Sequence, residues 1–271
     1  MRIVTWNVNG LRAALRKGFE DAVRTLEPDV LLLQEIRCTP ADLVRLAGKD
    51  GVRGDWSAPE GWHVRWHPAQ RPGYSGVAVL AREPFRTAGI GLGGDDADEE
   101  GRVLTVRVRD LRIASVYLPS GSSSDERQRV KERFMRAYGD WAAGQVRSRI
   151  PTIHAGDYNV ARDERDIFHW RSNQDVSGFL PHERAWLNDL VASGWHDLVR
   201  EEAGDREGPY TWWSNRGQAR ALDRGWRIDH VLANRRARGM IVRAQVHRDL
   251  CLSDEGPATS DHAPVSVDVD A

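Results

Sequence analysis

The stretch from His63 to Leu118 decides the fold, because it carries four strand-like runs in succession with no convincing helix between them. These runs are His63-Val64-Arg65-Trp66-His67, Gly76-Val77-Ala78-Val79-Leu80-Ala81, Val103-Leu104-Thr105-Val106-Arg107-Val108 and Ile113-Ala114-Ser115-Val116-Tyr117-Leu118. Consecutive strands with no helix between them favour antiparallel pairing over repeated strand–helix–strand units. The middle of the chain therefore predicts an antiparallel meander.

The sequence on either side adds more strands and a few helices. Further strands are predicted at Ile3–Asn7, Asp29–Glu35, Ile150–Ala155, Tyr210–Trp213, Arg227–Ala233, Ile241–Val246 and Pro264–Val269. Helical spacing of apolar residues predicts helices at Leu11–Leu26, from a capping box at Ser123 and Glu126 to about Arg147, and at Pro181–Ala192. We expect an α/β (α+β) fold, a four-layer sandwich of two mostly antiparallel sheets packed face to face with helices outside.

The chain reads as one domain, because no linker, repeat or low-complexity segment interrupts residues 1–271. The formal net charge of −1 says nothing by itself about a polyanionic partner. The segment from Arg216 to Arg248 is different, with nine arginines against Asp223 and Asp229, a local balance of +7. It suits phosphate binding in one place, or is a solvated arginine-rich surface. The run Asp95–Glu100 is strongly acidic.

Cysteine content and hydrophobicity bound the cellular setting. Cys38 and Cys251 are the only cysteines, too few for a disulfide framework or a thiolate zinc site. The chain begins with a strand pattern rather than a signal peptide, and no stretch approaches the roughly 20 apolar residues of a membrane span. We expect a cytoplasmic protein without membrane contact, associated with the nucleoid if the source is prokaryotic.

Polar clusters stand at the ends of five separate apolar runs. They are Asn7-Val8-Asn9, Gln34-Glu35, Asp157-Tyr158-Asn159, Asp229-His230 and Ser260-Asp261-His262. Carboxylates, amides and a histidine at the tips of several strands are what a metal-assisted hydrolase needs. The pattern therefore predicts one composite site assembled from the whole chain.

Each cluster also has a plainer interpretation. Glu35 follows a buried run, where a carboxylate needs a partner or a cation such as Mg²⁺, yet it could simply cap the next helix. Asp157 and Asn159 face the same way in an extended segment and could hold a water and a phosphate oxygen, or form an Asx turn. Asp229 could orient the imidazole of His262 and raise its basicity.

The remaining histidines and the tryptophans need separate interpretation. We interpret His154 and His230 as packing residues. Most of the 11 tryptophans fit a core, but Trp212, Trp213 and Trp226 fall within or beside the basic segment. Aromatic side chains among arginines suit stacking on an exposed sugar or base, although Tyr210–Trp213 would also serve as a plain buried strand.

Taken in order, the motifs resemble those of the exonuclease III / AP-endonuclease family, within the endonuclease–exonuclease–phosphatase superfamily. The matching stretches span essentially the whole chain, in family order and spacing: Trp6–Ala13, Leu33–Glu35, Gly73–Ala78, Tyr117–Pro119, Gly156–Ala161, Ser177–Phe179, Tyr210–Trp213, Gly225–Asp229 and Ser260–His262.

This resemblance implies a role for each matched residue. Glu35 is expected to be the main ligand of Mg²⁺, with Mn²⁺ as a substitute, and the residues at or near the ion are Asn7, Asn9, Asp157, Asn159 and Asp261. Asp157 would activate the water or protonate the leaving oxygen. Asn7 and Asn159 would hold phosphate oxygens or water, and Tyr117 would donate toward the phosphate.

The resemblance also implies how substrate is held. His262, oriented by Asp229, would supply positive charge or a donor at the scissile phosphorus. Trp212, Trp226 and Ile228 match the pocket for a flipped-out, base-free deoxyribose, and Asn173 and Arg227 match further substrate contacts. Extrusion is cheaper at an abasic site, since no base pair has to be broken.

The implied activity is Mg²⁺-dependent repair of double-stranded DNA by a monomer. It comprises incision 5′ to abasic sites, 3′→5′ exonuclease and 3′-phosphatase activity, in proportions that the sequence does not rank. Two positions depart from the family: Ser120 stands where Asn or Gln is common, and Val176 replaces a polar residue. The alternatives are a deoxyribonuclease I-like nuclease, a sphingomyelinase or inositol phosphatase-like enzyme, or a catalytically silent DNA-binding module.

Overall fold

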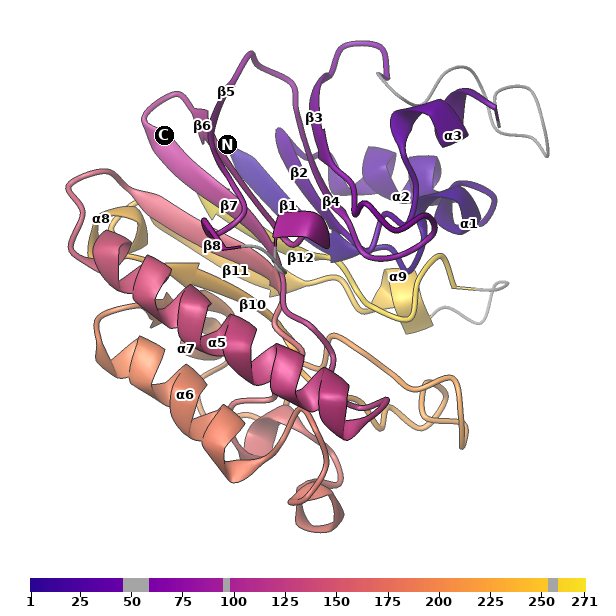
Figure 1. Ribbon diagram of the computed structural model, residues 1–271, viewed down its shortest axis with the longest axis vertical. Coiled ribbons are helices and arrows are strands. Elements are labelled where there is room, and N and C mark those ends of the chain that lie inside the picture. The colour runs from indigo at the N-terminus through magenta and orange to yellow at the C-terminus, as the bar shows by residue number, and fades with distance from the viewer. Residues whose placement is uncertain (46–58, 95–97, 253–257) are drawn as a thin grey trace.

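The computed structural model describes residues 1–45, 59–94, 98–252 and 258–271. Two six-stranded sheets lie face to face with helices on their outer sides, as Figure 1 shows, which confirms the predicted four-layer sandwich. The first sheet has the order β11-β12-β1-β2-β4-β3 and the second the order β5-β6-β7-β8-β10-β9. Within the predicted acidic run, residues 95–97 lie outside the described part of the chain.

The strands of the first sheet are β1 (Arg2–Asn7), β2 (Val30–Gln34), β3 (His63–His67), β4 (Val77–Ala81), β11 (Ile241–Val246) and β12 (Val265–Val269). Those of the second are β5 (Arg86–Ile90), β6 (Val103–Val108), β7 (Leu111–Tyr117), β8 (Thr152–Asp157), β9 (His196–Asp197) and β10 (Asp229–Ala233). Only β1–β2 and β7–β8 pair in parallel among the strand pairs of the described residues. Each parallel pair is joined through helices, because a parallel connection has to cross the sheet.

The helices of the described chain cover the two outer faces. They are α1 (Leu11–Leu15), α2 (Phe19–Leu26), α3 (Pro40–Val44), α5 (Asp125–Val146), α6 (Pro181–Ala192), α7 (Leu198–Ala203), α8 (Arg235–Arg238) and α9 (Asp249–Leu252). Short 3₁₀ turns occur at Glu164–Asp166 and Trp170–Asn173. None of the described helices is both long and apolar enough to cross a membrane.

Alternation within the strands separates three apolar layers. In β2, Val30 and Leu32 face the central core between the sheets, whereas Leu31 and Leu33 face the helices α1 and α2. Both faces of this strand are buried, which explains its continuous apolar run. A third cluster packs α5 and α6 against the second sheet.

Four predictions are wrong. The runs between His63 and Leu118 do not form one meander, because β3 and β4 pair in the first sheet and β6 and β7 in the second. The predicted helix Leu11–Leu26 is two helices, because Gly18 has φ +88°, a left-handed conformation that ends the first helix before the second begins. The helix expected from Ser123 begins one residue later, with Ser124 as its N-cap accepting from the Arg127 amide. Tyr210–Trp213 is not a strand, and only Trp212 forms isolated bridges, to Trp226 and His262.

A fully buried ion pair joins the outer helices to the second sheet. Lys131 of α5 and Glu183 of α6 both have side chains with 0% exposure, and their charged atoms lie 2.7 Å apart. Lys131 also donates to the Asn159 carbonyl at 2.8 Å, and Glu183 accepts from the Gly178 amide at 2.6 Å. The pair therefore fixes both ends of the loop between Asn159 and Gly178.

Replacing Lys131 by Met should destabilise the protein by about 3–5 kcal/mol, because Glu183 would remain buried without its cation. Urea denaturation measures the loss. Arg129→Met on the same helix is the control, since its side chain is 68% exposed and should cost no more than about 0.5 kcal/mol. Equal effects of the two substitutions would contradict the stabilising role of the buried pair.

Candidate active site

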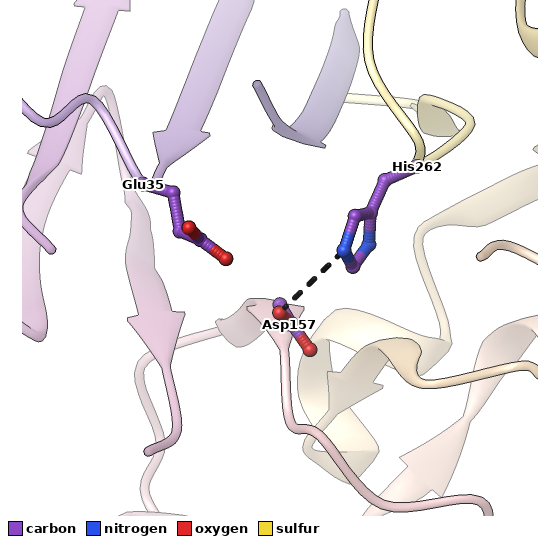
Figure 2. Close-up of side chains that lie close together, drawn as sticks. All are labelled: Glu35, Asp157 and His262. Atoms are coloured by element: carbon purple, nitrogen blue, oxygen red, sulfur yellow. Dashed lines mark ion pairs between the residues drawn. The ribbon is translucent and has the colours of Figure 1, made fainter. Parts of the chain in front are cut away.

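The five polar clusters meet at one end of the sandwich, where strands of both sheets terminate. Asn7 ends β1 and pairs in register with Gln34 at the end of β2, so that Glu35 follows immediately. In the other sheet Asp157 at the end of β8 pairs with Asp229 at the start of β10. Figure 2 shows Glu35, Asp157 and His262 converging from separate segments. The predicted composite site is thus assembled as expected.

An amide links the carboxylates of the two sheets. The Asn7 Nδ2 donates to Glu35 Oε1 and to Asp157 Oδ2, both at 2.9 Å. Its Oδ1 accepts from the Asn9 amide at 3.0 Å, and the side chain is fully buried. Asn7 therefore positions two carboxylates from behind the site, while its predicted contact with an ion or a phosphate remains a prediction.

Asp157 sits at the centre of this cluster with 1% exposure. Besides the Asn7 amide it accepts from the Asn159 backbone N–H at 2.8 Å and from Asn159 Nδ2 at 3.1 Å. The pKa of Asp157 is raised to about 7, mainly by burial. The charge of His262 lowers this pKa, and the charges of Asp229 and Glu35 raise it. A carboxyl group with a pKa near neutral can accept or release a proton under physiological conditions.

His262 is held by a carboxylate on its far side. Its Nδ1 is hydrogen-bonded to Asp229 Oδ2 at 2.8 Å, and its Nε2 lies 3.9 Å from Asp157 Oδ2. Burial lowers the pKa of His262, but the charge and hydrogen bond of Asp229, together with Asp157 and Asp261, outweigh burial and raise it to about 10. The ring is therefore an imidazolium at neutral pH, with Nε2–H directed into the site.

Asp261 faces the same cavity and is fixed from two directions. Asn9 Nδ2 donates to one of its oxygens at 2.8 Å, and Trp212 Nε1 donates to the other at 3.1 Å. Burial raises the pKa of Asp261, but His262 and these two donors lower it below its usual value overall. Asp261 is accordingly a carboxylate with a fixed orientation.

Tyr117 lies at the end of β7 and lines the same cavity. The guanidinium of Arg102 stacks over its ring at 4.6 Å and donates to its carbonyl at 3.1 Å. Burial, and then the charge of Glu35, raise the pKa of Tyr117 well above its ordinary value of 10. The phenol therefore stays protonated and can donate a hydrogen bond, while its predicted donation to a phosphate remains a prediction.

These side chains line a cavity of about 280 Å³. Its walls are formed by Asn9, Glu35, Arg37, Tyr117, Ser120, Ser122, Asp157, Asn159, Val176, Ser177, Gly178, Trp212, Trp226, Ile228, Asp261 and His262. Trp212 and Trp226 meet edge to face, with ring centroids 6.1 Å apart. The cavity thus combines charged side chains, such as Glu35 and His262, with aromatic and apolar ones, such as Trp226 and Ile228.

Arg227 corrects the predicted set of substrate contacts. Its side chain has 0% exposure, and its guanidinium forms paired hydrogen bonds with both Asp166 and Asp197. All three guanidinium nitrogens donate to protein carboxylates, so the prediction that Arg227 contacts substrate is wrong. It anchors the start of β10 instead.

Some of the other predicted residues line the cavity and some do not. Asn173 donates to the His169 carbonyl at 2.7 Å and does not line the cavity. Trp213 is fully buried, as in the plain-core interpretation, whereas Trp212 and Trp226 reach the cavity. His154 and His230 are fully buried, which confirms them as packing residues.

The arginine-rich segment does not form one surface, contrary to the expectation of a single phosphate-binding flank. Arg216 and Arg224 are exposed in the loop before β10, whereas Arg235 and Arg236 follow the other end of that strand. Arg227 between them is buried. The strand therefore divides the positive charge between two ends of the molecule.

Sequence reasoning missed one charged residue of the site. Arg37 lines the cavity and forms an ion pair with Glu35 through Nη2 and Oε2. Both residues have positive φ, 52° at Glu35 and 50° at Arg37. Strand alternation therefore does not apply to this turn, and no sequence signal that we know would have paired the two side chains.

The chemistry of the donor set fits a hard divalent cation. Ligand atoms of Glu35, Asp157 and His262 lie within 4.8 Å of one another. His262 as an imidazolium has no lone pair to offer at Nε2, so the oxygens of Glu35, Asp157 and the neighbouring Asp261 are the better donors. Carboxylate oxygens are the ligands that Mg²⁺ and Mn²⁺ prefer.

Comparison with known proteins shows the family of the chain. Residues 4–262 match the model of the Endonuclease/Exonuclease/phosphatase family, and the chain belongs to this family. An exodeoxyribonuclease of Bacillus subtilis is 32% identical over 258 residues, covering 95% of this chain and 97% of the relative. The DNA repair nuclease APEX1 of Danio rerio is 31% identical, covering 96% of this chain and 81% of the relative.

Solved structures show the same fold. A 3′-5′ exonuclease from Neisseria meningitidis superposes with a TM-score of 0.84 at 26% identity, and each chain covers 100% of the other. An AP endonuclease from Archaeoglobus fulgidus has a TM-score of 0.83 at 23% identity over 100% of both chains. The predicted family and fold are confirmed.

Asp229→Asn should lower the pKa of His262 toward or below 6.5, because the substitution removes the charge that outweighs burial. The imidazole would then be neutral at pH 8, where it is charged in the wild type. An NMR titration of the ring in metal-free, DNA-free protein measures this pKa. Asp261→Asn is the control and should change it less, since Asp261 makes no hydrogen bond to the ring. An unchanged pKa in Asp229→Asn would contradict the pairing.

Proposed function

We propose that the protein is a Mg²⁺-dependent DNA-repair phosphodiesterase that incises double-stranded DNA 5′ to abasic sites and also processes 3′ ends. The observation that carries the proposal is the cavity itself. It holds an imidazolium and several carboxylates together with apolar and aromatic side chains. A phosphodiester with a base-free sugar beside it has the matching distribution of polar and apolar groups.

The polar residues of the cavity have complementary tasks in this proposal. Glu35 and Asp261 would hold the cation, which when bound supplies positive charge near the phosphate. The Nε2–H of His262 donates to a non-bridging phosphate oxygen, where negative charge grows during attack. The Tyr117 hydroxyl donates toward the phosphate. Asp157 carries a proton to or from the reacting oxygens. Its pKa of about 7 suits either direction.

The aromatic and apolar residues of the cavity support recognition of an extruded sugar. Trp226 packs against Gly178, where an added Cβ would lie 3.0 Å from the indole ring, so the wall is already closely packed. Ile228 and Trp212 complete an apolar surface beside the carboxylates. A deoxyribose without a base would bury its apolar face here.

The relatives' names support DNA as the substrate class. They include an exodeoxyribonuclease, a DNA repair nuclease and, from Dictyostelium discoideum, a DNA-(apurinic or apyrimidinic site) endonuclease that is 31% identical and covers 100% of this chain. A structure related at 26% identity is titled a 3′ phosphatase bound to a product DNA hairpin. We therefore include 3′-end processing in the proposal.

Labelled duplexes with an internal abasic site, a 3′-phosphate or an intact blunt end test the proposal directly. With Mg²⁺ the purified protein should cleave the first two, and chelator should abolish both reactions. Glu35→Gln should lower kcat by about 100-fold or more, since it removes a charge from the cation site. Glu126→Gln, on an exposed helix surface, is the control. Cleavage that survives chelator would contradict the metal requirement.

Trp226→Ala separates the abasic pocket from the reacting centre. We expect KM for the abasic duplex to rise about 10-fold, because the substitution removes much of the apolar wall. Removal of a 3′-phosphate, which needs no extruded sugar, should change less. Trp62→Ala is the matched aromatic control, because Trp62 packs against Arg82 away from the cavity. A parallel loss on both substrates would contradict the assignment of Trp226 to the abasic pocket.

A further inference from the structure

A second cavity, of about 380 Å³, lies at a different place on the molecule. It is lined by Val146, Arg147, Ser148, Arg149, Ser193, Gly194, His196, Arg235 and Arg236. These residues come from three segments: the end of α5, the turn after α6 and the start of α8. Figure 1 shows α8 beside the end of α5. The cavity shares no lining residue with the active site.

The second cavity lies at the opposite end of the second sheet. Strands β8 and β10 pair from Asp157 and Asp229, in the active site, to Ile153 and Ala233. Arg149 precedes this far end of β8, and Arg235 follows the far end of β10. Four strand intervals at about 3.3 Å each separate the two ends by about 13 Å. One small ligand therefore cannot occupy both cavities.

The four arginines of this cavity have no acidic partner. Within the part of the chain that the structure describes, no carboxylate forms an ion pair with Arg147, Arg149, Arg235 or Arg236, nor does any of these guanidiniums donate a hydrogen bond. All four are exposed residues, whereas the buried Arg102 is paired with Glu100. Glu201, which pairs with His196 of the cavity lining, also pairs with Arg238.

Helix dipoles do not account for this cluster. The C-terminal end of a helix carries only about half a negative charge, which falls off within a turn. Asn234 Nδ2 already donates to the carbonyl of Gln145 in the last turn of α5 and to those of Ser148 and Ile150 just after the helix, at 3.0–3.4 Å. Four guanidinium groups around one hollow are more than these helix ends require.

The same asparagine makes the frame of the cavity rigid. Asn234 has 0% exposure, and its Oδ1 accepts from the amides of Thr152 and Ala237 at 3.1 and 3.0 Å. It thereby ties the segment of Arg147 and Arg149 to the segment of Arg235 and Arg236. Fixed backbone positions lower the entropy that a ligand must remove on binding.

We propose that this cavity binds a compact polyphosphate anion, such as the phosphate chain of a nucleoside triphosphate or inorganic tripolyphosphate. Arginine presents a planar fork of donors that matches phosphate oxygens in pairs. Several such forks around one hollow suit charge concentrated at one point. A DNA duplex spreads its charge along an extended backbone and favours a long basic stripe instead.

Isothermal titration of metal-free protein with inorganic tripolyphosphate, and separately with ATP, at about 0.15 M salt tests this site. The wild type should bind both. The double variant Arg147→Gln/Arg236→Gln should bind about 10-fold more weakly, because two charge-assisted contacts are lost. Arg24→Gln/Arg129→Gln removes the same charge from other surface helices and should bind like the wild type. Incision of an abasic duplex should be equal in all three proteins.

Other outcomes would overturn the proposal. Equal weakening in both double variants would show general attraction to positive charge rather than a site. Loss of binding in His262→Asn but not in Arg147→Gln/Arg236→Gln would place the anion in the active site. Displacement of tripolyphosphate by an intact duplex would assign the cavity to a nucleic-acid backbone. Tripolyphosphate binding without ATP binding would restrict the ligand to the inorganic anion and support the same site.

Discussion

The hydrogen bonds of a single amide hold the active site together. The Asn7 Nδ2 donates at 2.9 Å to a carboxylate of each sheet, Glu35 in one and Asp157 in the other. Two acidic groups this close repel each other, and burial adds to the cost of charging them. One buried donor, shared between them, offsets part of this repulsion and fixes their separation. The same two hydrogen bonds therefore link the two sheets and set the geometry of the site.

The excess negative charge explains the state of the histidine. Asp229, Asp157 and Asp261 surround His262 and keep its ring protonated despite its burial. In return, the imidazolium stabilises the charged forms of Asp157 and Asp261. The arrangement suits a phosphate ester, since charge that develops on phosphate oxygens meets a fixed cation without reorganisation of solvent.

The sequence predicts those features that depend on local pattern. The apolar run Val30–Leu33 predicts a strand buried on both faces, and the polar residues after each strand predict where the site lies. Features set by distant residues could not be predicted. Arg227 looks like a surface arginine until Asp166 and Asp197 are placed around it, and Arg37 meets Glu35 only because both adopt positive φ. The split of the arginine-rich segment likewise depends on where β10 runs.

In the proposed function, Glu35 and Asp261 hold a divalent cation beside Asp157 of the other sheet. Titration of metal-free, DNA-free protein with Mn²⁺, followed by electron paramagnetic resonance of the free ion, tests it without reference to activity. The account predicts saturable Mn²⁺ binding that Mg²⁺ displaces and that weakens by about 10-fold or more in Glu35→Gln, because a charged oxygen ligand is lost. Mn²⁺ binding of equal affinity in Glu35→Gln would contradict it.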